Sequence, residues 1–277
     1  MIVPTNPKCQ DASMNKLLNT AIKASVEAGA EIMKIYGESF EVTLKTDNSP
    51  LTIADENANA IINTHLLKTD IPIISEENKQ TAYATRKTWD TCWMVDPLDG
   101  TKEFVKRNGE FTVNIALIKN NKPVLGVIYV PVTKTLYYAL VSDQKAYKIT
   151  LEDHCYSTEI HSKVKEELIP IREDSAEIKV VASRSHLNEE TEAFMANLEK
   201  QGKQVSTVSV GSSLKFCLVA EGKATIYPRF APTMEWDTAA GHAICNAVGL
   251  KVMQKDIDKE LQYNKAALLN PHFIVKK

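Results

Sequence analysis

Apolar residues recur at helical spacing over residues 15–36, and this periodicity predicts an amphipathic helix that ends before Gly37. Thr52 and Asp55 form the pattern of a capping box, in which the two residues satisfy each other's free groups at a helix start. This pair predicts that a second helix begins there and runs to about Leu67.

Short apolar runs predict strands in the rest of the first half of the chain. Two of them end at acidic residues, because IPIIS (residues 71–75) stops at Glu76 and TCWMVDP stops at Asp96. Three longer runs are separated by short polar turns, which is typical of an antiparallel meander. These runs are residues 111–118, 123–130 and 135–141, and a shorter strand-like run covers residues 40–45.

The second half of the chain has a different pattern. Residues 151–176 are polar, charged and irregular in period, and we take them as the boundary between two halves, 1–160 and 177–277. Strand-like and helix-like runs alternate after this boundary, which favours layered packing of helices and sheets. The strand-like runs are 178–183, 204–210 and 224–228, and the helix-like runs are 188–201, a segment after Gly211, and 236–247.

Composition narrows the class of protein. The 277 residues are 44% hydrophobic and 25% charged, which is typical of a globular protein with a large core. The formal net charge of -2 provides no basic field for a long nucleic acid. The five cysteines are scattered and form no C-x-x-C pair, which indicates a reducing compartment and argues against a zinc site.

The sequence has no signal of membrane insertion or export. No window approaches the roughly 18 consecutive apolar residues of a spanning helix, and the first residues lack the pattern of a signal peptide. We therefore expect a cytoplasmic protein. Two points stay open at this level: a peripheral association with the cytoplasmic face of the inner membrane, and the choice between a monomer and a homodimer.

Four acidic residues stand at the ends of predicted elements. Glu76, Asp96 and Asp99 follow apolar strands, and Asp237 begins a helix. Ligands in layered folds bind beyond such strand ends, and gathered carboxylates repel one another unless cations lie between them. Mg²⁺ prefers oxygen ligands of this kind. Taken singly, each of the four could instead be a solvated strand end or a helix cap.

The segment DPLDGT, residues 96–101, suits a metal site. Pro97 ends the strand because it has no N–H donor, and the Leu98 carbonyl can face the same side as the two carboxylates. Gly100 lets the backbone approach a ligand, and Thr101 can cap a short helix. Because Asp, Pro and Gly are the commonest turn residues, a plain turn is the alternative for this segment alone.

Three segments together resemble one family. PIISEEN, WMVDPLDGTKEF and EWDTAAGHAI have the order and approximate spacing found in the lithium-sensitive, magnesium-dependent phosphatases that include inositol monophosphatase. Within that superfamily, KTDNSPLTIAD, VASRSH and GSSLKFCLVAEGKATIYPRFAPTMEWDTAAG look like the CysQ-type 3'(2'),5'-bisphosphate nucleotidases of bacteria. The resemblance implies an α+β fold, a layered α-β-α-β-α sandwich. It also implies hydrolysis of the 3'-phosphate of adenosine 3',5'-bisphosphate to AMP and phosphate, in sulfate assimilation.

The resemblance also implies two positions for Mg²⁺. Glu76, Asp96 and the Leu98 carbonyl would bind one ion. Asp96, Asp99 and Asp237 would bind the other, so Asp96 would bridge the two. A third, weaker ion beside Glu76 is left open.

Catalytic and substrate-binding residues follow from the same resemblance. Asp47 and Thr101 match the pair that orients and deprotonates the attacking water, although an Asp in an ordinary Asn-Ser-Pro loop is the alternative for Asp47. We predict catalytic roles for Asp47, Thr101 and Glu76. We expect substrate contacts from Leu98, Asp99, Gly100, Thr101, His186, Ser212, Ser213, Lys215, Arg229 and Asp237.

A second phosphate and a nucleoside require cationic and hydroxyl donors away from the metals. GSSLK places Ser212, Ser213 and Lys215 at the start of a predicted helix, where amides and hydroxyls can hold an anion. Arg229 follows a strand and can bind a phosphate through its planar guanidinium. His186 matches a family position near the nucleotide. Without the resemblance, His186 and Lys215 would read as a surface-loop histidine and a solvated helix lysine.

Two other functions share most of these residues. An inositol or sugar phosphatase, including an inositol polyphosphate 1-phosphatase, would use the same metal ligands, and residues 183–235 separate it from a nucleotidase. A non-catalytic nucleotide-sensing protein would keep the pocket without the chemistry. Retention of the complete acidic set with Asp47 and Thr101 argues against that function.

Overall fold

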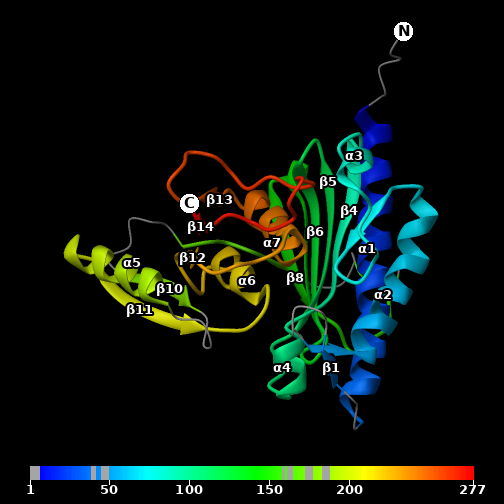
Figure 1. Ribbon diagram of the computed structural model, residues 1–277, viewed down its shortest axis with the longest axis horizontal. Coiled ribbons are helices and arrows are strands. Elements are labelled where there is room, and N and C mark those ends of the chain that lie inside the picture. The colour runs from blue at the N-terminus through cyan, green and yellow to red at the C-terminus, as the bar shows by residue number, and fades with distance from the viewer. Residues whose placement is uncertain are drawn as a thin grey trace.

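A central sheet of seven strands organises the chain in the computed structural model (Figure 1), which describes residues 7–38, 42–44, 50–157, 160, 165–171, 177–182 and 188–277. For residues 7–11, 42–44, 50 and 51 it describes the backbone alone. The strand order follows the chain from β3 to β9, with β3 parallel to β4 and every other pair antiparallel. The strands are β3 (Ile73–Ser75), β4 (Thr91–Asp99), β5 (Thr112–Lys119), β6 (Lys122–Val130), β7 (Thr135–Leu140), β8 (Lys145–Thr150) and β9 (Glu166–Glu167).

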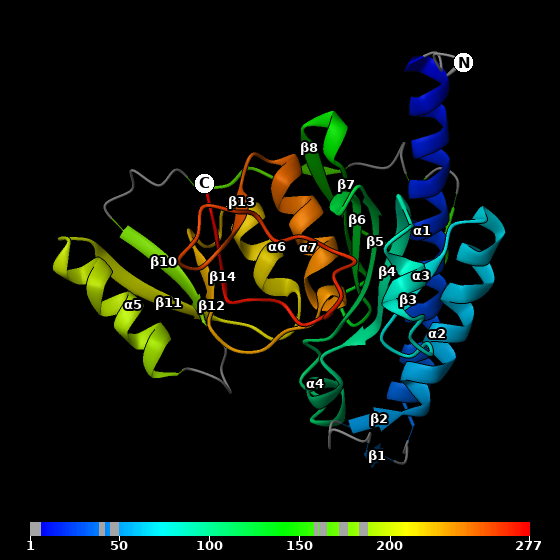
Figure 2. The same cartoon turned by 45° about the horizontal axis from the view of Figure 1, so that its top comes forward.

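Helices cover both faces of this sheet. Helices α1 (Pro7–Tyr36) and α2 (Ile53–Leu66) lie on one face, and α6 (Leu214–Ala220) and α7 (Glu235–Ala247) lie on the other (Figure 1). Two smaller sheets follow, a parallel pair of β10 (Glu177–Ala182) and β11 (Gln204–Ser209), and β12 (Tyr227–Arg229), β14 (Phe273–Lys276) and β13 (Lys251–Gln254). Helix α5 (Glu189–Lys200) lies at the end of the molecule opposite α1 (Figure 2). This order of layers confirms the predicted α-β-α-β-α sandwich.

Smaller elements complete the chain. A ribbon of β1 (Val42–Leu44) and β2 (Pro50–Thr52) precedes α2. The short helices are η1 (Leu67–Thr69), α3 (Tyr83–Arg86), α4 (Thr101–Val105) and η2 (Val141–Asp143). Among the helices that the structure describes, none is both long enough and apolar enough to cross a bilayer.

Local chemistry explains the predicted elements. Helix α1 ends at Tyr36 as its periodicity indicates, although it begins at Pro7, earlier than expected. At the start of α2, Thr52 N and Thr52 Oγ1 donate to Asp55 Oδ2 at 2.8 and 2.7 Å, which confirms the capping box. The strand bounds of the meander β5–β7 agree with the three predicted runs to within one residue.

Five strands were not predicted, and β4 was predicted too short. β8 has lysines at its first and fourth positions, β2 and β9 are three and two residues long, and β13 and β14 are four residues each, so none gives a long apolar run. β4 does not stop at Asp96 but continues to Asp99, because Asp99 pairs with Thr112 beyond a register shift. The extra pairing holds the whole DPLD segment against β5.

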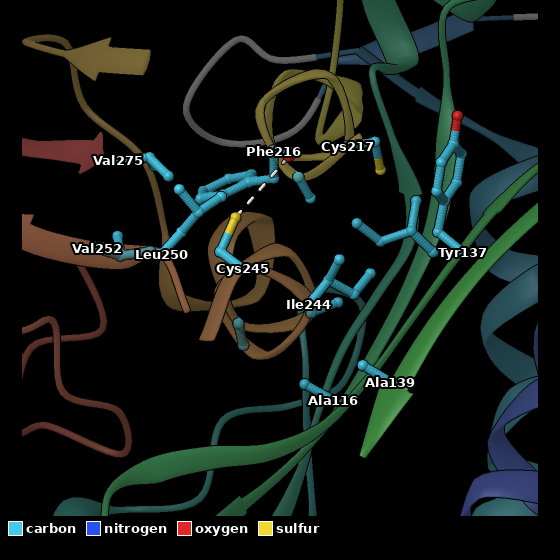
Figure 3. Packing of buried hydrophobic residues seen from close by; sticks show 14 of the residues in the cluster. Ala116, Tyr137, Ala139, Phe216, Cys217, Ile244, Cys245, Leu250, Val252 and Val275 are labelled. Atoms are coloured by element: carbon cyan, nitrogen blue, oxygen red, sulfur yellow. Dashed lines mark hydrogen bonds between the residues drawn. The ribbon is translucent and has the colours of Figure 1, made fainter. Parts of the chain in front are cut away.

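Apolar side chains of the central sheet divide between two cores. On β6, Leu125, Val127 and Tyr129 face the cluster that includes α1 and α2, whereas Ile128 and Val130 face the cluster that includes α6 and α7. Because both faces are covered, the strand reads as a continuous apolar run rather than an alternating one. Figure 3 shows the second cluster, where Cys245 on α7 packs beside Phe216 on α6, with a sulfur-to-carbonyl distance of 3.8 Å.

Helix α7 lies unusually close to β6, at Gly126. A methyl group at Gly126 would overlap the Ala240 carbonyl oxygen and lie 2.8 Å from the Ala243 side chain. The absence of a side chain therefore lets the helix backbone contact the strand directly. Since α7 carries Asp237, this contact also sets the distance of Asp237 from the strand ends.

We expect Gly126→Ala to destabilise the protein by about 1–3 kcal/mol, because α7 has to move away from β6 to admit the methyl group. Gly37→Ala is the control, since its methyl group would make an ordinary contact, 3.4 Å from the Lys34 carbonyl oxygen. That change should stay within about 0.5 kcal/mol of the wild type. Urea unfolding measures the free energy of unfolding of both variants. Equal stability of Gly126→Ala and Gly37→Ala would contradict the close packing of α7 on β6.

Candidate active site

The end of β4 brings two carboxylates to one place. Asp96 is 1% exposed, and its Oδ1 accepts a hydrogen bond of 3.1 Å from Leu98 N, which fixes the turn through Pro97. Gly100 then has a φ of +94°, and a Cβ there would lie 3.1 Å from the Glu110 carbonyl oxygen. A left-handed backbone in so small a space explains the glycine of DPLDGT.

Two further carboxylates converge on Asp96 from other elements. Glu76 follows β3, the parallel neighbour of β4, and Asp237 is the third residue of α7. Asp237 Oδ2 accepts a hydrogen bond of 2.8 Å from Met234 N, which orients it at the helix start. One oxygen atom each from Glu76, Asp96 and Asp237 lie within 4.8 Å of one another.

Burial and like charge act against ionisation here. Burial, with the neighbouring Glu76 and Asp99, raises the pKa of Asp96 well above its ordinary value. Burial and Asp99 likewise raise the pKa of Asp237. A divalent cation would remove this repulsion, and three converging carboxylates are the ligands that a hard cation takes. The site therefore fits a metal ion.

Asp99 is held by a polar network at the side of this cluster. Burial raises its pKa to about 6, against the opposing charge of Lys215 and a hydrogen bond from Asn114 Nδ2 at 3.3 Å. The backbone of Ser213 also bonds to the Asp99 carboxylate. Asn114 Oδ1 accepts bonds from Ser213 Oγ at 2.7 Å and Thr112 Oγ1 at 3.1 Å. The network connects Asp99 with the start of α6.

Thr101 faces the same turn. Its hydroxyl lies 3.1 Å from Asp55 Oδ1 and 3.3 Å from the Leu98 carbonyl oxygen. Asp55 is 1% exposed, so the capping residue of α2 also holds Thr101. Asp47, which the resemblance pairs with Thr101, lies outside the described residues.

One cavity extends from the acidic cluster to two cationic side chains. Asp99 and Asp237 line it together with Ser212, Lys215 and Arg229. Lys215 is 6% exposed, and burial lowers its pKa to about 8, while the charge of Asp99 opposes that change. Ser212 Oγ and Arg229 Nε are buried and have no hydrogen-bond partner among the described residues. These atoms can donate to an anion that enters the cavity.

Part of the GSSLK segment is already engaged within the protein. Gly211 N donates to Glu110 Oε2 at 2.8 Å, and Lys215 Nζ donates to the Ser212 carbonyl at 2.9 Å. Ser213 Oγ lies 2.8 Å from Thr112 Oγ1 in addition to its bond with Asn114. Ser213 therefore holds Asp99 in place, and the Ser212 hydroxyl keeps its bonding capacity. The predicted nucleotide contact His186 lies outside the described residues.

Sequence reasoning missed several residues of the site. Asn114 and Thr112 are polar residues in the otherwise apolar run FTVNIALI, a signal that could have marked them. Glu103 and Glu110 line the cavity but look like ordinary surface charges in the sequence. Asp55 was explained fully by its capping box, and its contact with Thr101 depends on the tertiary fold.

Removing one of the like charges should stabilise the metal-free protein. In Asp96→Asn the amide oxygen can still accept the bond from Leu98 N, and no buried charge remains at this position. We expect metal-free D96N to melt several degrees above the metal-free wild type, since about 1 kcal/mol corresponds to roughly 2–4 °C at this size. A divalent chloride should raise the Tm of the wild type and leave that of D96N nearly unchanged.

The pH dependence has a definite sign. A carboxyl whose pKa is raised by folding costs stability as pH rises from its ordinary pKa through the raised one. The advantage of D96N should therefore be present at neutral pH and disappear in acid, where the wild-type carboxyl is protonated in both states. Thermal unfolding in EDTA, from acid to neutral pH, measures the difference in Tm between D96N and the wild type. A difference that is independent of pH would contradict the electrostatic cause.

Comparisons with known proteins identify the family of the chain. Residues 13–275 match the model of the inositol monophosphatase family. A curated relative from Salmonella typhimurium, named 3'(2'),5'-bisphosphate nucleotidase CysQ, is 45% identical over 264 residues, which cover 94% of this chain and 99% of the relative. The relative of that name from Escherichia coli K12 is 43% identical over 94% of this chain and 99% of its own length.

Solved structures give the same result. The crystal structure of CysQ from Bacteroides thetaiotaomicron, described as a bacterial member of the inositol monophosphatase family, has a TM-score of 0.82 and 52% identity, covering 93% of this chain and 95% of its own. An IMPase from Thermotoga maritima, at 22% identity, 94% and 92% coverage and a TM-score of 0.70, shares the fold. The chain belongs to the inositol monophosphatase family.

Proposed function

We propose that this chain is a magnesium-dependent phosphatase that removes the 3'-phosphate of adenosine 3',5'-bisphosphate and releases AMP. The observation that carries this proposal is one cavity that is lined by the acidic residues Asp99 and Asp237 and by the cationic residues Lys215 and Arg229. A substrate with two phosphates needs one of them at the reacting centre and a cationic position for the second. The names of the similar bacterial nucleotidases support the same substrate.

The acidic centre would hold the metal ions. Glu76, Asp96 and the Leu98 carbonyl would bind one Mg²⁺, and Asp96, Asp99 and Asp237 would bind a second, with a third beside Glu76 left open. Bound Mg²⁺ supplies a Lewis acid for the phosphoryl oxygens and lowers the pKa of a bound water. The oxygen-only ligand set favours magnesium over zinc or copper.

In this reaction Thr101 would orient the attacking water. When its hydroxyl donates to Asp55, its oxygen can still accept a hydrogen bond from a water molecule. Asp47 remains the predicted base that takes the water's proton. The new bond joins the water oxygen to phosphorus, the bond from phosphorus to the ribose 3' oxygen breaks, and that oxygen leaves with a proton.

The part of the cavity that Ser212, Lys215 and Arg229 line would hold the second phosphate. Arg229 Nε and the Ser212 hydroxyl are buried donors that need an acceptor, and the Lys215 ammonium adds a positive charge beside them. In this role the protein would work in the cytoplasm on a by-product of sulfate assimilation. Its partner is then a small phosphate ester rather than a macromolecule.

Purified protein should release phosphate from adenosine 3',5'-bisphosphate in the presence of magnesium, and lithium should inhibit it. Asp99→Asn should lower kcat by a factor of about 100 or more, because it removes a metal ligand and keeps the side-chain shape.

A panel with inositol 1-phosphate, inositol 1,4-bisphosphate and fructose 1,6-bisphosphate tests the choice of substrate. Faster hydrolysis of an inositol or sugar phosphate would contradict the proposal, and binding without hydrolysis would indicate a nucleotide sensor.

Arg229→Ala should raise the KM for adenosine 3',5'-bisphosphate by roughly tenfold or more, because a charge-assisted bond to the second phosphate is lost. The KM for adenosine 3'-monophosphate, which lacks that phosphate, should change much less. Arg229→Lys keeps the charge without the planar guanidinium, and its KM for the bisphosphate should lie between those of the wild type and Arg229→Ala. Steady-state kinetics on both substrates measures this, and an equal rise for the two would remove Arg229 from the phosphate site.

A further inference from the structure

The turn before α6 has an unusual backbone at the residue that lines the cavity. Ser212 has a φ of +46°, in the left-handed region that side chains other than glycine adopt at a cost. Such a conformation persists only when the neighbouring structure imposes it. The contacts on each side of Ser212 therefore decide whether its hydroxyl lies in the cavity.

The turn is fixed on its C-terminal side by groups that also serve the metal centre. Ser213 Oγ bonds to Asn114 and Thr112, and its backbone bonds to Asp99. Lys215 Nζ donates to the Ser212 carbonyl. A substitution on this side would disturb Asp99 as well, so its effect on the turn could not be distinguished from its effect on the predicted metal ligands.

On its N-terminal side the turn is fixed by Glu110. Gly211 N donates to Glu110 Oε2 at 2.8 Å. Glu110, two residues before β5, also packs directly against Gly211, because a Cβ on Gly211 would lie 2.9 Å from the Glu110 carbonyl oxygen and 3.0 Å from the Glu110 Cβ, with Glu103 Cγ also at 2.9 Å. The Glu110 carbonyl lies 3.1 Å from the corresponding position on Gly100. Glu110 thus contacts both the metal-binding loop and the turn at α6.

The charge of Glu110 has two opposite effects on the binding of a phosphate in this cavity. A carboxylate that lines a cavity for a phosphate repels that phosphate, so on charge alone its removal would tighten binding. A carboxylate also accepts a hydrogen bond from a backbone amide more strongly than a neutral group does. The two effects have opposite signs, which allows an experiment to separate them.

We propose that Glu110 is a positioning residue for the second phosphate of the substrate: through Gly211 N it holds the turn so that the Ser212 hydroxyl faces that phosphate. This inference rests on the proposed function, because it assigns the second phosphate to the cavity beside Ser212, Lys215 and Arg229. It concerns the binding of the substrate and leaves the chemistry at the metal centre unchanged.

The test compares Glu110→Ala with Glu110→Gln on two substrates that differ by one phosphate. E110A loses the acceptor for Gly211 N, and its KM for adenosine 3',5'-bisphosphate should rise about tenfold while kcat stays within about twofold. Its KM for adenosine 3'-monophosphate should stay near the wild-type value. E110Q keeps an acceptor oxygen without the charge, and its KM for the bisphosphate should remain at or below the wild-type value.

Glu103→Gln is the charge control, because Glu103 lines the same cavity and packs against Gly211 through its Cγ, which glutamine keeps, while no side-chain hydrogen bond joins it to the turn among the described residues. If E110A lowers the KM for the bisphosphate as E103Q does, Glu110 acts through its charge and the positioning role is overturned. An equal rise of KM for both substrates, or a fall in kcat alone, also overturns it.

A binding measurement separates this inference from the proposed function. Calorimetry with AMP, which carries the second phosphate and lacks the scissile one, requires no hydrolysis. If the wild type binds AMP but does not hydrolyse the bisphosphate, the proposed reaction fails, while an affinity about tenfold weaker for E110A, with E110Q unchanged, still supports the role of Glu110. Equal AMP affinity in the wild type and E110A overturns that role whatever the activity.

Discussion

Asp96 and Asp237 repel each other, so packing has to hold them together. Asp96 is fixed by the end of β4 and by its bond from Leu98 N, and Asp237 is fixed by α7. Helix α7 can reach this place because Gly126 lets its backbone lie directly on β6. The stability of two apolar cores thus maintains an arrangement that electrostatics opposes. A cation that binds between the carboxylates converts this cost into affinity for the metal.

The same arrangement connects the acidic cluster with the rest of the cavity. Asp99 belongs to the acidic cluster, yet its bonds come from Asn114 and from Ser213 at the start of α6. Ser212, the next residue toward the N-terminus, lines the same cavity together with Lys215 and Arg229. One short network of buried hydrogen bonds therefore connects Asp99 with the turn that carries Ser212. In the proposed function, a rigid connection of this kind would favour a substrate whose two phosphates are a fixed distance apart.

Local patterns predicted the parts of this structure that local chemistry determines. The capping box at Thr52 and Asp55, the meander and the acidic ends of β3 and β4 all follow from residues close in sequence. The continuation of β4 to Asp99 depends on pairing with Thr112, and the contact of Glu110 with Gly211 joins residues 101 positions apart. Side-chain patterns carry no record of such pairings. Asn114 stands out as a polar residue in an apolar run, but its contacts, and the supporting roles of Asp55 and Glu110, emerged only in three dimensions.

Substrate choice in this fold cannot come from the acidic centre alone. The IMPase from Thermotoga maritima shares the layers of this chain at 22% identity, and likeness at that level shows the fold alone. Any phosphate ester can use a metal centre of this kind, because the reacting group is the same in each. The groups that distinguish one ester from another must contact the rest of the substrate. Under the proposed function, those groups would be the buried donors on Ser212 and Arg229, and the position of Ser212 depends on residues outside the acidic cluster.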